Sequence, residues 1–114
     1  MPECIFCGII QGKLATQFIH TDNNVVAFED IQPKAPVHIL LVTRQHIATL
    51  NDLTENEHNL VAALTQTAVQ LAKELGHAQK GYRLVMNCNE QGDQTIFHLH
   101  MHLLAGRKLN QGMG

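Results

Sequence analysis

The sequence has 114 residues, of which 45% are hydrophobic, and a formal net charge of −2 at pH 7. This composition excludes a disordered chain, because it supplies enough apolar surface for one folded domain over residues 1–114. The small charge gives no reason to expect a nucleic-acid or membrane partner, so any affinity for phosphate must be local.

The N-terminal segment contains Cys4-Ile5-Phe6-Cys7, a spacing typical of half of a metal site. A pair of buried hydrophobic thiols and a redox pair are the alternatives. A zinc site would need two more ligands, for which the eight histidines are candidates. No signal peptide, transmembrane run or lipidation motif is visible, and the three cysteines are an odd number, so we expect a cytoplasmic protein without a disulfide framework. Residues 5–11 are predicted to form a short helix that ends at Gly12.

Two short strands are predicted over 18–20 and 25–29, separated by turn-forming residues at 22–24. Residues 30–36 should form a rigid loop, because two prolines there bar both helix and sheet. Asp30 begins this loop, either as a turn former or as a carboxylate that accepts hydrogen bonds from a diol such as ribose.

The continuous apolar run 39–43 predicts a central strand that is covered on both faces. His46 follows this strand and could be a metal ligand, a residue that orients another site residue, or an ordinary surface histidine. Further on, Thr54 and Glu57 have the spacing of a capping box. The helix that they begin is predicted to run to about Leu75, before Gly76. Its apolar stripe is interpreted as core: Leu60, Val61, Leu64, Ala68, Leu71, Ala72 and Leu75.

A strand over 82–87 and a polar loop over 89–94 are predicted to lead into the last strand as a hairpin. This hairpin would bring Asn87 and the Gln94-Thr95 segment close to the histidines of that strand. Polar groups gathered there could surround a phosphate.

The segment 97–105 has a histidine at every second position, at His98, His100 and His102. This period of two predicts a strand with the imidazoles on one face and apolar residues packed into the core on the other. The outer imidazoles are about 13 Å apart along the strand, so the three cannot all bind one metal ion. Polar side chains that merely face water are the alternative interpretation, but histidine offers a strand little propensity. The spacing favours a row of donors, acceptors and one nucleophile along an anionic group.

The run His98-Leu99-His100-Met101-His102-Leu103-Leu104 resembles the signature of the histidine triad (HIT) superfamily. The order and spacing of its Hint branch are matched by Cys4 and Cys7, the segment 28–36, His46-Ile47, Gly81-Tyr82-Arg83, Asn87 and Gln94-Thr95, so the resemblance covers residue 4 to about residue 107. It implies an α+β fold, with a five-stranded antiparallel sheet, one long helix and a short N-terminal helix. It also implies a homodimer in which the sheets of two subunits join. The tail 108–114 is expected to be flexible.

The resemblance further implies a purine-nucleotide-binding hydrolase that converts nucleoside 5′-phosphoramidates and aminoacyl-adenylates to AMP. By position, His100 would be the nucleophile that forms a covalent nucleotidyl-histidine intermediate. His98 and His102 would hold and protonate the phosphate and the leaving group. The implied nucleotide contacts are Phe6, Phe28 and Ile31 for the base, Asp30 for the ribose, and Asn87, Gln94 and Thr95 with His100 and His102 for the phosphate.

Four residues, Cys4, Cys7, His46 and His98, resemble the ligands of a structural zinc ion in members that keep both cysteines, while no cofactor is expected for catalysis. Asp93 departs from the Gly or Ala that is usual in that loop, although Asp tolerates left-handed geometry. The tail also lacks an aromatic residue found in some relatives. Three alternatives stay open: a dinucleoside polyphosphate hydrolase, a metal-dependent hydrolase, and a nucleotide-binding interaction module whose hydrolysis is incidental.

Overall fold

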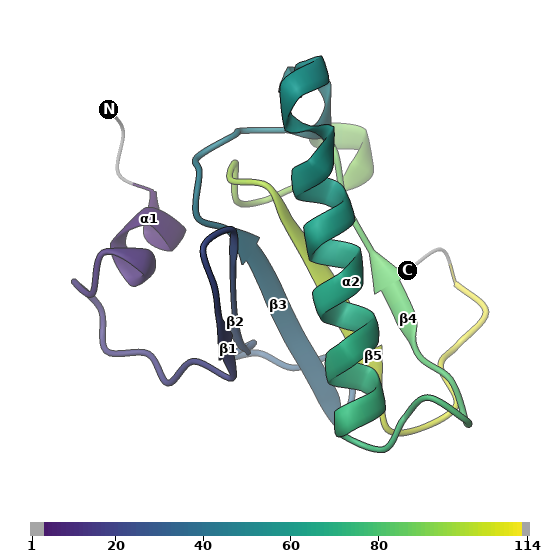
Figure 1. The fold of residues 1–114 in the computed structure, drawn as a ribbon. Coiled ribbons are helices and arrows are strands. Elements are labelled where there is room, and N and C mark those ends of the chain that lie inside the picture. Colours follow the sequence, from purple (N-terminus) through teal and green to yellow (C-terminus); the bar gives the residue numbers. More distant parts are fainter. Residues whose placement is uncertain (1–3, 113–114) are drawn as a thin grey trace.

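The computed structural model describes residues 4–112, which combine an antiparallel sheet with one long helix (Figure 1). The strands are β1 (His20–Thr21), β2 (Val25–Glu29), β3 (Val37–Thr43), β4 (Arg83–Val85) and β5 (His100–Ala105). The helices are α1 (Ile5–Ile10) and α2 (His58–Glu74), with 3-10 turns at Leu50–Asp52, Glu55–Glu57 and Glu90–Gly92. The five strands lie in the order β1-β2-β3-β5-β4, and each neighbouring pair is antiparallel. The predicted α+β architecture is therefore confirmed.

β3 is the central strand, with β2 on one side and β5 on the other, as its apolar run predicts. Its side chains alternate between the two faces of the sheet. Ile39 and Leu41 join the core cluster that includes residues of α2, whereas Leu40 and Val42 join a second cluster that includes residues of α1. The sheet is thus covered on both faces, by different helices.

The long helix α2 packs across one face of the sheet (Figure 1). The predicted capping box between Thr54 and Glu57 is present, but it closes a 3-10 turn, so the α-helix itself begins at His58. Gly76 follows the helix at φ +85°, in agreement with the predicted stop. Leu75, which we expected in the apolar stripe, is the C-cap and is 46% exposed. The buried residues of α2 are Leu60, Leu64, Thr67, Ala68, Leu71 and Ala72.

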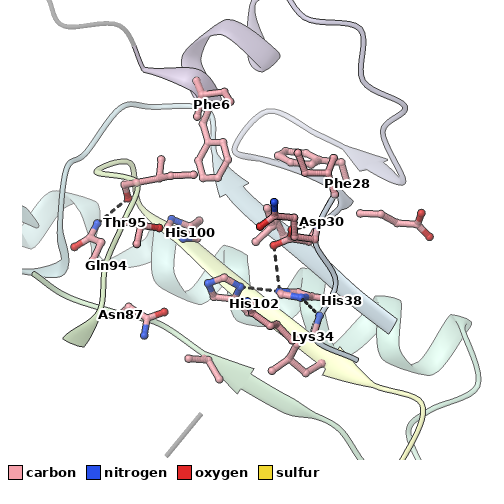
Figure 2. Close-up of a pocket in the computed structure, with 18 of the residues that line it drawn as sticks. Phe6, Phe28, Asp30, Lys34, His38, Asn87, Gln94, Thr95, His100 and His102 are labelled. Carbon is pink, nitrogen blue, oxygen red and sulfur yellow. Dashed lines mark hydrogen bonds and ion pairs between the residues drawn. The ribbon is translucent and has the colours of Figure 1, made fainter. Parts of the chain in front are cut away.

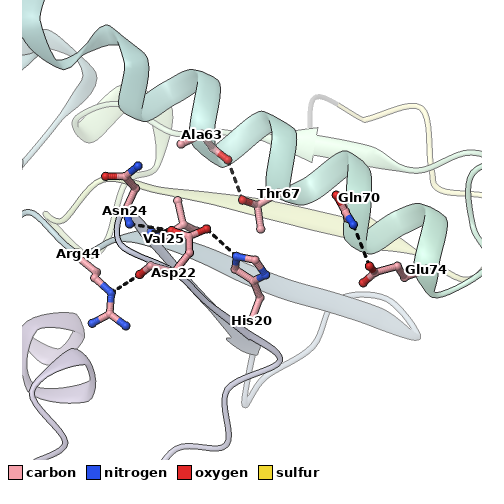
Figure 3. A network of polar contacts seen from close by, with 9 residues as sticks. All are labelled: His20, Asp22, Asn24, Val25, Arg44, Ala63, Thr67, Gln70 and Glu74. Carbon is pink, nitrogen blue, oxygen red and sulfur yellow. Dashed lines mark hydrogen bonds and ion pairs between the residues drawn. The ribbon is translucent and has the colours of Figure 1, made fainter.

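The predicted turn between β1 and β2 is held by the carboxylate of Asp22 (Figure 3). One of its oxygens accepts hydrogen bonds from the backbone N–H groups of Asn24 and Val25, at 2.7 and 2.8 Å. The other lies 2.7 Å from Nε2 of His20, and this hydrogen bond is the main cause that lowers the pKa of Asp22. Arg44 donates from Nε to the carbonyl oxygen of Asp22 at 2.6 Å and so ties the turn to the end of β3.

Three strands are shorter than the sequence predicts. β1 is displaced from 18–20 to His20–Thr21, and β4 covers only part of 82–87. β5 begins at His100 rather than at residue 97, because its pairing with β3 ends where Val42 faces His100. His98 therefore precedes the strand, and the prediction that all three histidines share one strand face is wrong for His98.

The loop between β4 and β5 turns through two left-handed residues, Asn89 at φ 59° and Asp93 at φ 60°. Asp93 thus adopts the geometry that we expected it to tolerate. In the predicted tail, residues 113–114 lie outside the described range, while 108–112 contain no helix or strand. Arg83 donates from its guanidinium to the carbonyl oxygen of Asn110 at 2.6 Å, so this part of the tail is tied to β4. Within 4–112, no helix has both the length and the apolar character needed to cross a bilayer.

Gly106 is required where the chain leaves β5. Its φ is +102°, and a Cβ added there would lie 2.7 Å from Cβ of Pro36. Gly106→Ala should therefore destabilise the protein by more than the ~1–3 kcal/mol expected from the backbone conformation alone. Gly81→Ala is the matched control, because Gly81 has φ +99° and open space around it. Urea unfolding of both variants measures the difference, and equal losses would contradict the steric explanation.

Candidate active site

A pocket of about 630 Å³ lies on the face of the sheet opposite the core packed by α2 (Figure 2). β5 supplies its floor, because His100 and His102 alternate with Met101 and Leu103, which pack into that core. All nine residues that the sequence predicts as nucleotide contacts line the pocket: Phe6, Phe28, Asp30, Ile31, Asn87, Gln94, Thr95, His100 and His102. The pocket also has lining residues that the prediction did not include, above all Lys34 and His38.

Two buried aromatic rings form the apolar wall of the pocket. Phe6 from α1 and Phe28 from β2 meet edge to face, with ring centroids 5.8 Å apart. The ring of Phe6 also packs edge-on to the imidazole of His100, at 5.1 Å between centroids. Ile31 stands at the rim and is 93% exposed. This wall and rim offer the kind of flat apolar surface on which a nucleobase can pack.

His100 is fixed in one tautomer by the backbone. Its Nδ1 lies 2.6 Å from the carbonyl oxygen of His98, which can only accept, so Nδ1 carries the proton and donates. Nε2 is then left with the lone pair. Burial lowers the pKa of His100, although the hydrogen bond to His98 opposes this shift. A neutral imidazole with a free Nε2 is a competent nucleophile at neutral pH.

His102 is the second pocket imidazole, and it is oriented by His38. Nδ1 of His38 accepts the backbone N–H of Lys34 at 3.0 Å, so its Nε2 carries the proton and donates to Nδ1 of His102 at 2.9 Å. Nε2 of His102 consequently bears the proton that is available to a ligand. The pKa of His102 is lowered to about 4, mainly by burial and to a smaller extent by the neighbouring His100 and His38. A bound phosphate would act in the opposite direction, because a negative charge favours the protonated ring.

The sequence prediction missed His38 because it began the central strand at residue 39. β3 begins at Val37, so His38 shares a strand face with Leu40, which lines the pocket. Pro36 was the available signal, because the strand can begin directly after it. The alternation of side chains would then extend two residues further, to Val37 and His38. With that extension, the sequence would have placed a fourth histidine on the pocket face.

Asp30 has the turn-forming role that the sequence predicts, and its second carboxylate oxygen is left at the pocket. One carboxylate oxygen accepts the backbone N–H of Gln32 at 2.8 Å, which is the turn-forming function. The other oxygen lies 3.4 Å from Nε2 of His38 and faces the pocket. The turn therefore holds the second carboxylate oxygen of Asp30 in place at the pocket, where it can accept a hydrogen bond.

The residues predicted to contact phosphate first stabilise their own loop. Asn87 donates to the carbonyl oxygen of Gly92 at 2.7 Å. The buried Gln94 donates to the carbonyl oxygens of Ala48 and Ile96, at 2.8 and 3.1 Å. The backbone N–H of Gln94 also donates, to the carbonyl oxygen of Asn89 at 3.0 Å, so Gln94 positions this loop and offers a phosphate no free donor. Thr95 brings a hydroxyl group to the pocket lining.

His98 lies in a separate cluster with two thiols and a second imidazole. Its Nδ1 is 3.3 Å from Sγ of Cys4, 3.6 Å from Sγ of Cys7 and 3.2 Å from Nδ1 of His46, while Nδ1 of His46 is 3.3 Å from Sγ of Cys7. His98 is fully buried beneath Phe6 and is absent from the pocket lining among the described residues. The structure therefore brings together the four residues that the resemblance groups as ligands, but the position of His98 does not support its direct contact with a phosphate.

The cluster has the geometry and the tautomer of a zinc site. A tetrahedral zinc ion holds sulfur and nitrogen ligands about 3.6 Å apart and two nitrogens about 3.3 Å apart. The observed separations of 3.2–3.6 Å agree with these values. Nε2 of His98 donates to the carbonyl oxygen of Thr43 at 2.6 Å, so Nδ1 offers its lone pair to the cluster. Burial and the neighbouring Cys4 raise the pKa of the Cys7 thiol, a penalty that a bound cation reverses.

A second group of possible ligands, Asp30, His38 and His102, has ligand atoms within 4.8 Å of one another but the wrong tautomer. Nε2 of His38 carries a proton, because its Nδ1 accepts the N–H of Lys34. A metal ion would need the lone pair of that nitrogen. In this tautomer His38 donates a hydrogen bond to His102 and lies 3.4 Å from Asp30, so the group is not arranged to bind a metal ion.

Comparison with known proteins agrees with this geometry. A family model described as "Scavenger mRNA decapping enzyme C-term binding" matches residues 3–114. The chain is 40% identical over 107 residues to a purine nucleoside phosphoramidase of Escherichia coli (strain K12), a match that covers 94% of this chain and 90% of that protein. A HIT family hydrolase from Legionella pneumophila Philadelphia 1 has the same fold, with a TM-score of 0.94, 41% identity, and coverage of 98% of this chain and 100% of that one.

A zinc-bound histidine triad family protein from Mycobacterium smegmatis is also similar, with a TM-score of 0.79, 29% identity, and coverage of 95% of this chain and 78% of that one. The sequence and structural matches span nearly the whole chain, and they agree with the alternating histidines on β5 and with the lined pocket above them. The chain belongs to the histidine triad (HIT) family.

Proposed function

We propose that this protein hydrolyses purine nucleoside 5′-phosphoramidates and aminoacyl-adenylates to AMP through a covalent intermediate on His100. The relative named purine nucleoside phosphoramidase and the HIT family hydrolase of the same fold support this reaction class. The observation that carries the proposal is the 2.6 Å hydrogen bond from Nδ1 of His100 to the carbonyl oxygen of His98. It leaves Nε2 of a half-buried, neutral imidazole as the nucleophile in a nucleotide-sized pocket.

In the first step, Nε2 of His100 attacks phosphorus and the bond from phosphorus to the leaving nitrogen breaks. The nitrogen is a poor leaving group unless it is protonated, so it takes a proton from Nε2 of His102. The negative phosphate raises the pKa of His102 in the complex and so favours the protonated form, in which Nδ1 also carries a proton and the hydrogen bond from His38 is given up. In the second step, water attacks phosphorus, the bond to Nε2 of His100 breaks, and His102 takes up the proton that the water loses. AMP leaves and both imidazoles return to their starting states.

The remaining pocket residues hold the nucleotide. The carboxylate of Asp30 is oriented by the N–H of Gln32 and accepts hydrogen bonds from the ribose hydroxyls. The base packs against Phe6, Phe28 and Ile31. The hydroxyl of Thr95 and the backbone of its loop donate to the phosphate oxygens, where charge develops in the transition state.

Zinc in the cluster of Cys4, Cys7, His46 and His98 is proposed as structural. When bound, the ion supplies a cross-link between α1 and the sheet. His98 faces the cluster with Nδ1, whereas His100, two residues further on, lines the pocket, so the reaction runs on imidazoles alone. The zinc-bound relative supports this assignment. Free thiols at these positions also favour a reducing compartment, and we propose the cytoplasm.

A homodimer is part of the same proposal. β4 is an edge strand of the sheet, and edge strands offer unpaired backbone groups to a second chain. Exposed apolar side chains on α2, Val69 at 46% and its C-cap Leu75 at 46%, offer surface that a partner subunit could cover.

Replacement of the nucleophile tests the reaction directly. His100→Asn should lower turnover of a fluorogenic adenosine phosphoramidate by roughly 10³-fold or more, because the residue that bonds to phosphorus is lost. The control is His58→Asn, which changes an exposed histidine at the start of α2 and should leave turnover unchanged. Intact-mass measurement of quenched wild-type protein should detect an AMP adduct on His100. Undiminished turnover of His100→Asn, or an adduct on another side chain, would refute the mechanism, whereas tight AMP binding with negligible wild-type turnover would favour an interaction module.

The pH dependence should separate the nucleophile from the acid. Burial lowers the pKa of His100 below its ordinary 6.5, so the neutral form prevails at pH 7 and is lost only as the pH falls further. With the p-nitrophenyl ester of AMP, whose leaving group needs no proton, kcat/KM should be flat from pH 8 to 7 and decline at lower pH. The phosphoramidate needs protonated His102, so its optimum should lie at a lower pH. Superimposable profiles, or an ester rate that increases toward pH 5, would contradict these roles.

Metal analysis tests the cluster. The purified protein should contain about one zinc ion per chain, and Cys7→Ser should lose it, because a thiolate ligand is removed. Cys88→Ser is the matched control, since Cys88 is a free cysteine outside the cluster. Zinc removal should also lower the melting temperature in calorimetry, because the ion binds only the folded arrangement. Equal zinc contents in the two variants would rule out the assignment.

A further inference from the structure

The metal cluster and the nucleotide pocket are joined by α1. Both thiols of the cluster come from this segment: Cys4 is the N-cap of α1 and Cys7 lies within it. Both imidazoles come from the sheet side, His46 after β3 and His98 before β5. An ion bound by all four would therefore cross-link α1 to the sheet. A helix of six residues has little stability of its own, so its position depends on such attachments.

Phe6 lies between the two cysteines and reaches from the cluster into the pocket. Its side chain is 2% exposed, and its ring packs edge-on to His98 at 5.9 Å and to His100 at 5.1 Å between centroids. The same ring meets Phe28 in the wall of the pocket (Figure 2). Phe6, which lies between two cluster cysteines in the sequence, is therefore also part of the pocket wall and packs against the nucleophile.

His98 provides a second connection. Its Nδ1 faces the thiols and its Nε2 donates to the carbonyl oxygen of Thr43. Its own carbonyl oxygen accepts the hydrogen bond from Nδ1 of His100. His98 is therefore held at three points: Nδ1 at the cluster, Nε2 at the end of β3, and the carbonyl oxygen at the nucleophile. A movement of the His98 ring can therefore shift the carbonyl oxygen of the same residue, which fixes the tautomer of His100.

We propose that occupancy of the Cys4–Cys7–His46–His98 cluster controls nucleotide affinity, with Phe6 as the positioning residue that transmits the effect. This inference rests on the proposed function and on metal binding at the cluster. When the ion is bound, α1 is fixed and Phe6 closes the wall beside His100. When the ion is removed, α1 keeps its apolar contacts and the weaker thiol–imidazole hydrogen bonds, and the wall loosens while His100 and His102 stay on β5. The cluster then adjusts nucleotide affinity to the availability of the metal, in addition to its structural role.

Nucleotide titration of matched proteins tests the coupling. Chelated wild-type protein should bind AMP about tenfold more weakly than the zinc-loaded form in calorimetry, a typical size for coupling between two sites. Restored zinc should recover the affinity. In Phe6→Ala the affinity should be low in both states and change less than twofold on chelation, because the transmitting ring is gone. Phe6→Leu keeps an apolar contact and should retain part of the metal dependence.

Hydrogen exchange gives a readout that needs no nucleotide. Chelation should speed exchange of the amides of α1 in wild-type protein and leave those of α2 unchanged, and Cys88→Ser should behave as wild type. If AMP fails to bind even the zinc-loaded protein, the proposed function fails, and exchange alone decides whether the cluster positions α1. Unchanged exchange in α1, or an equal effect of chelation on AMP affinity in wild type and Phe6→Ala, would overturn the inference.

Discussion

The pairing of β3 with β5 is the constraint on which the other features of the structure depend. Leu41 faces Met101 and Leu40 faces His102 in this ladder, so one face of the pair is continuous core and the other is continuous site. Because side chains alternate strictly along paired strands, a shift of one residue would exchange the two faces. The packing that buries Met101 against the α2 side therefore also directs His100 and His102 toward the pocket.

The tautomers of the histidines follow from the backbone groups around them. The rings of His98 and His100 donate hydrogen bonds to carbonyl oxygens, whereas the ring of His38 accepts a hydrogen bond from the N–H of Lys34. This difference makes His98 a competent metal ligand and gives His38 the role of a donor to His102. Residue type alone would make the four histidines equivalent. Their different chemistry comes from which backbone group each ring meets.

Much of the fold could be predicted from the sequence, because its signals are local. The turn at Asp22, the capping box at Thr54 and the apolar alternation of the last strand act over a few residues, and each is present in the structure. The ends of strands were predicted less well, since they depend on where a partner strand stops. His98 illustrates this: the period of two continues through it in sequence, but its partner strand has ended, and its ring turns toward the thiols. His38 was missed because β3 starts earlier than its apolar run. Pairing with β5 extends the strand back to Val37.

Ile31 has a consequence for the protein in its free state. It is 93% exposed on a loop whose backbone is restrained by prolines and by Asp30, so it cannot fold back to hide its side chain. Removal of such a side chain from water is worth about 1.5–3 kcal/mol. In the proposed function, a planar base that packs on Ile31 would remove this side chain from water and gain affinity without forming a hydrogen bond. A base of two fused rings would cover more of the side chain than a single ring and would gain more.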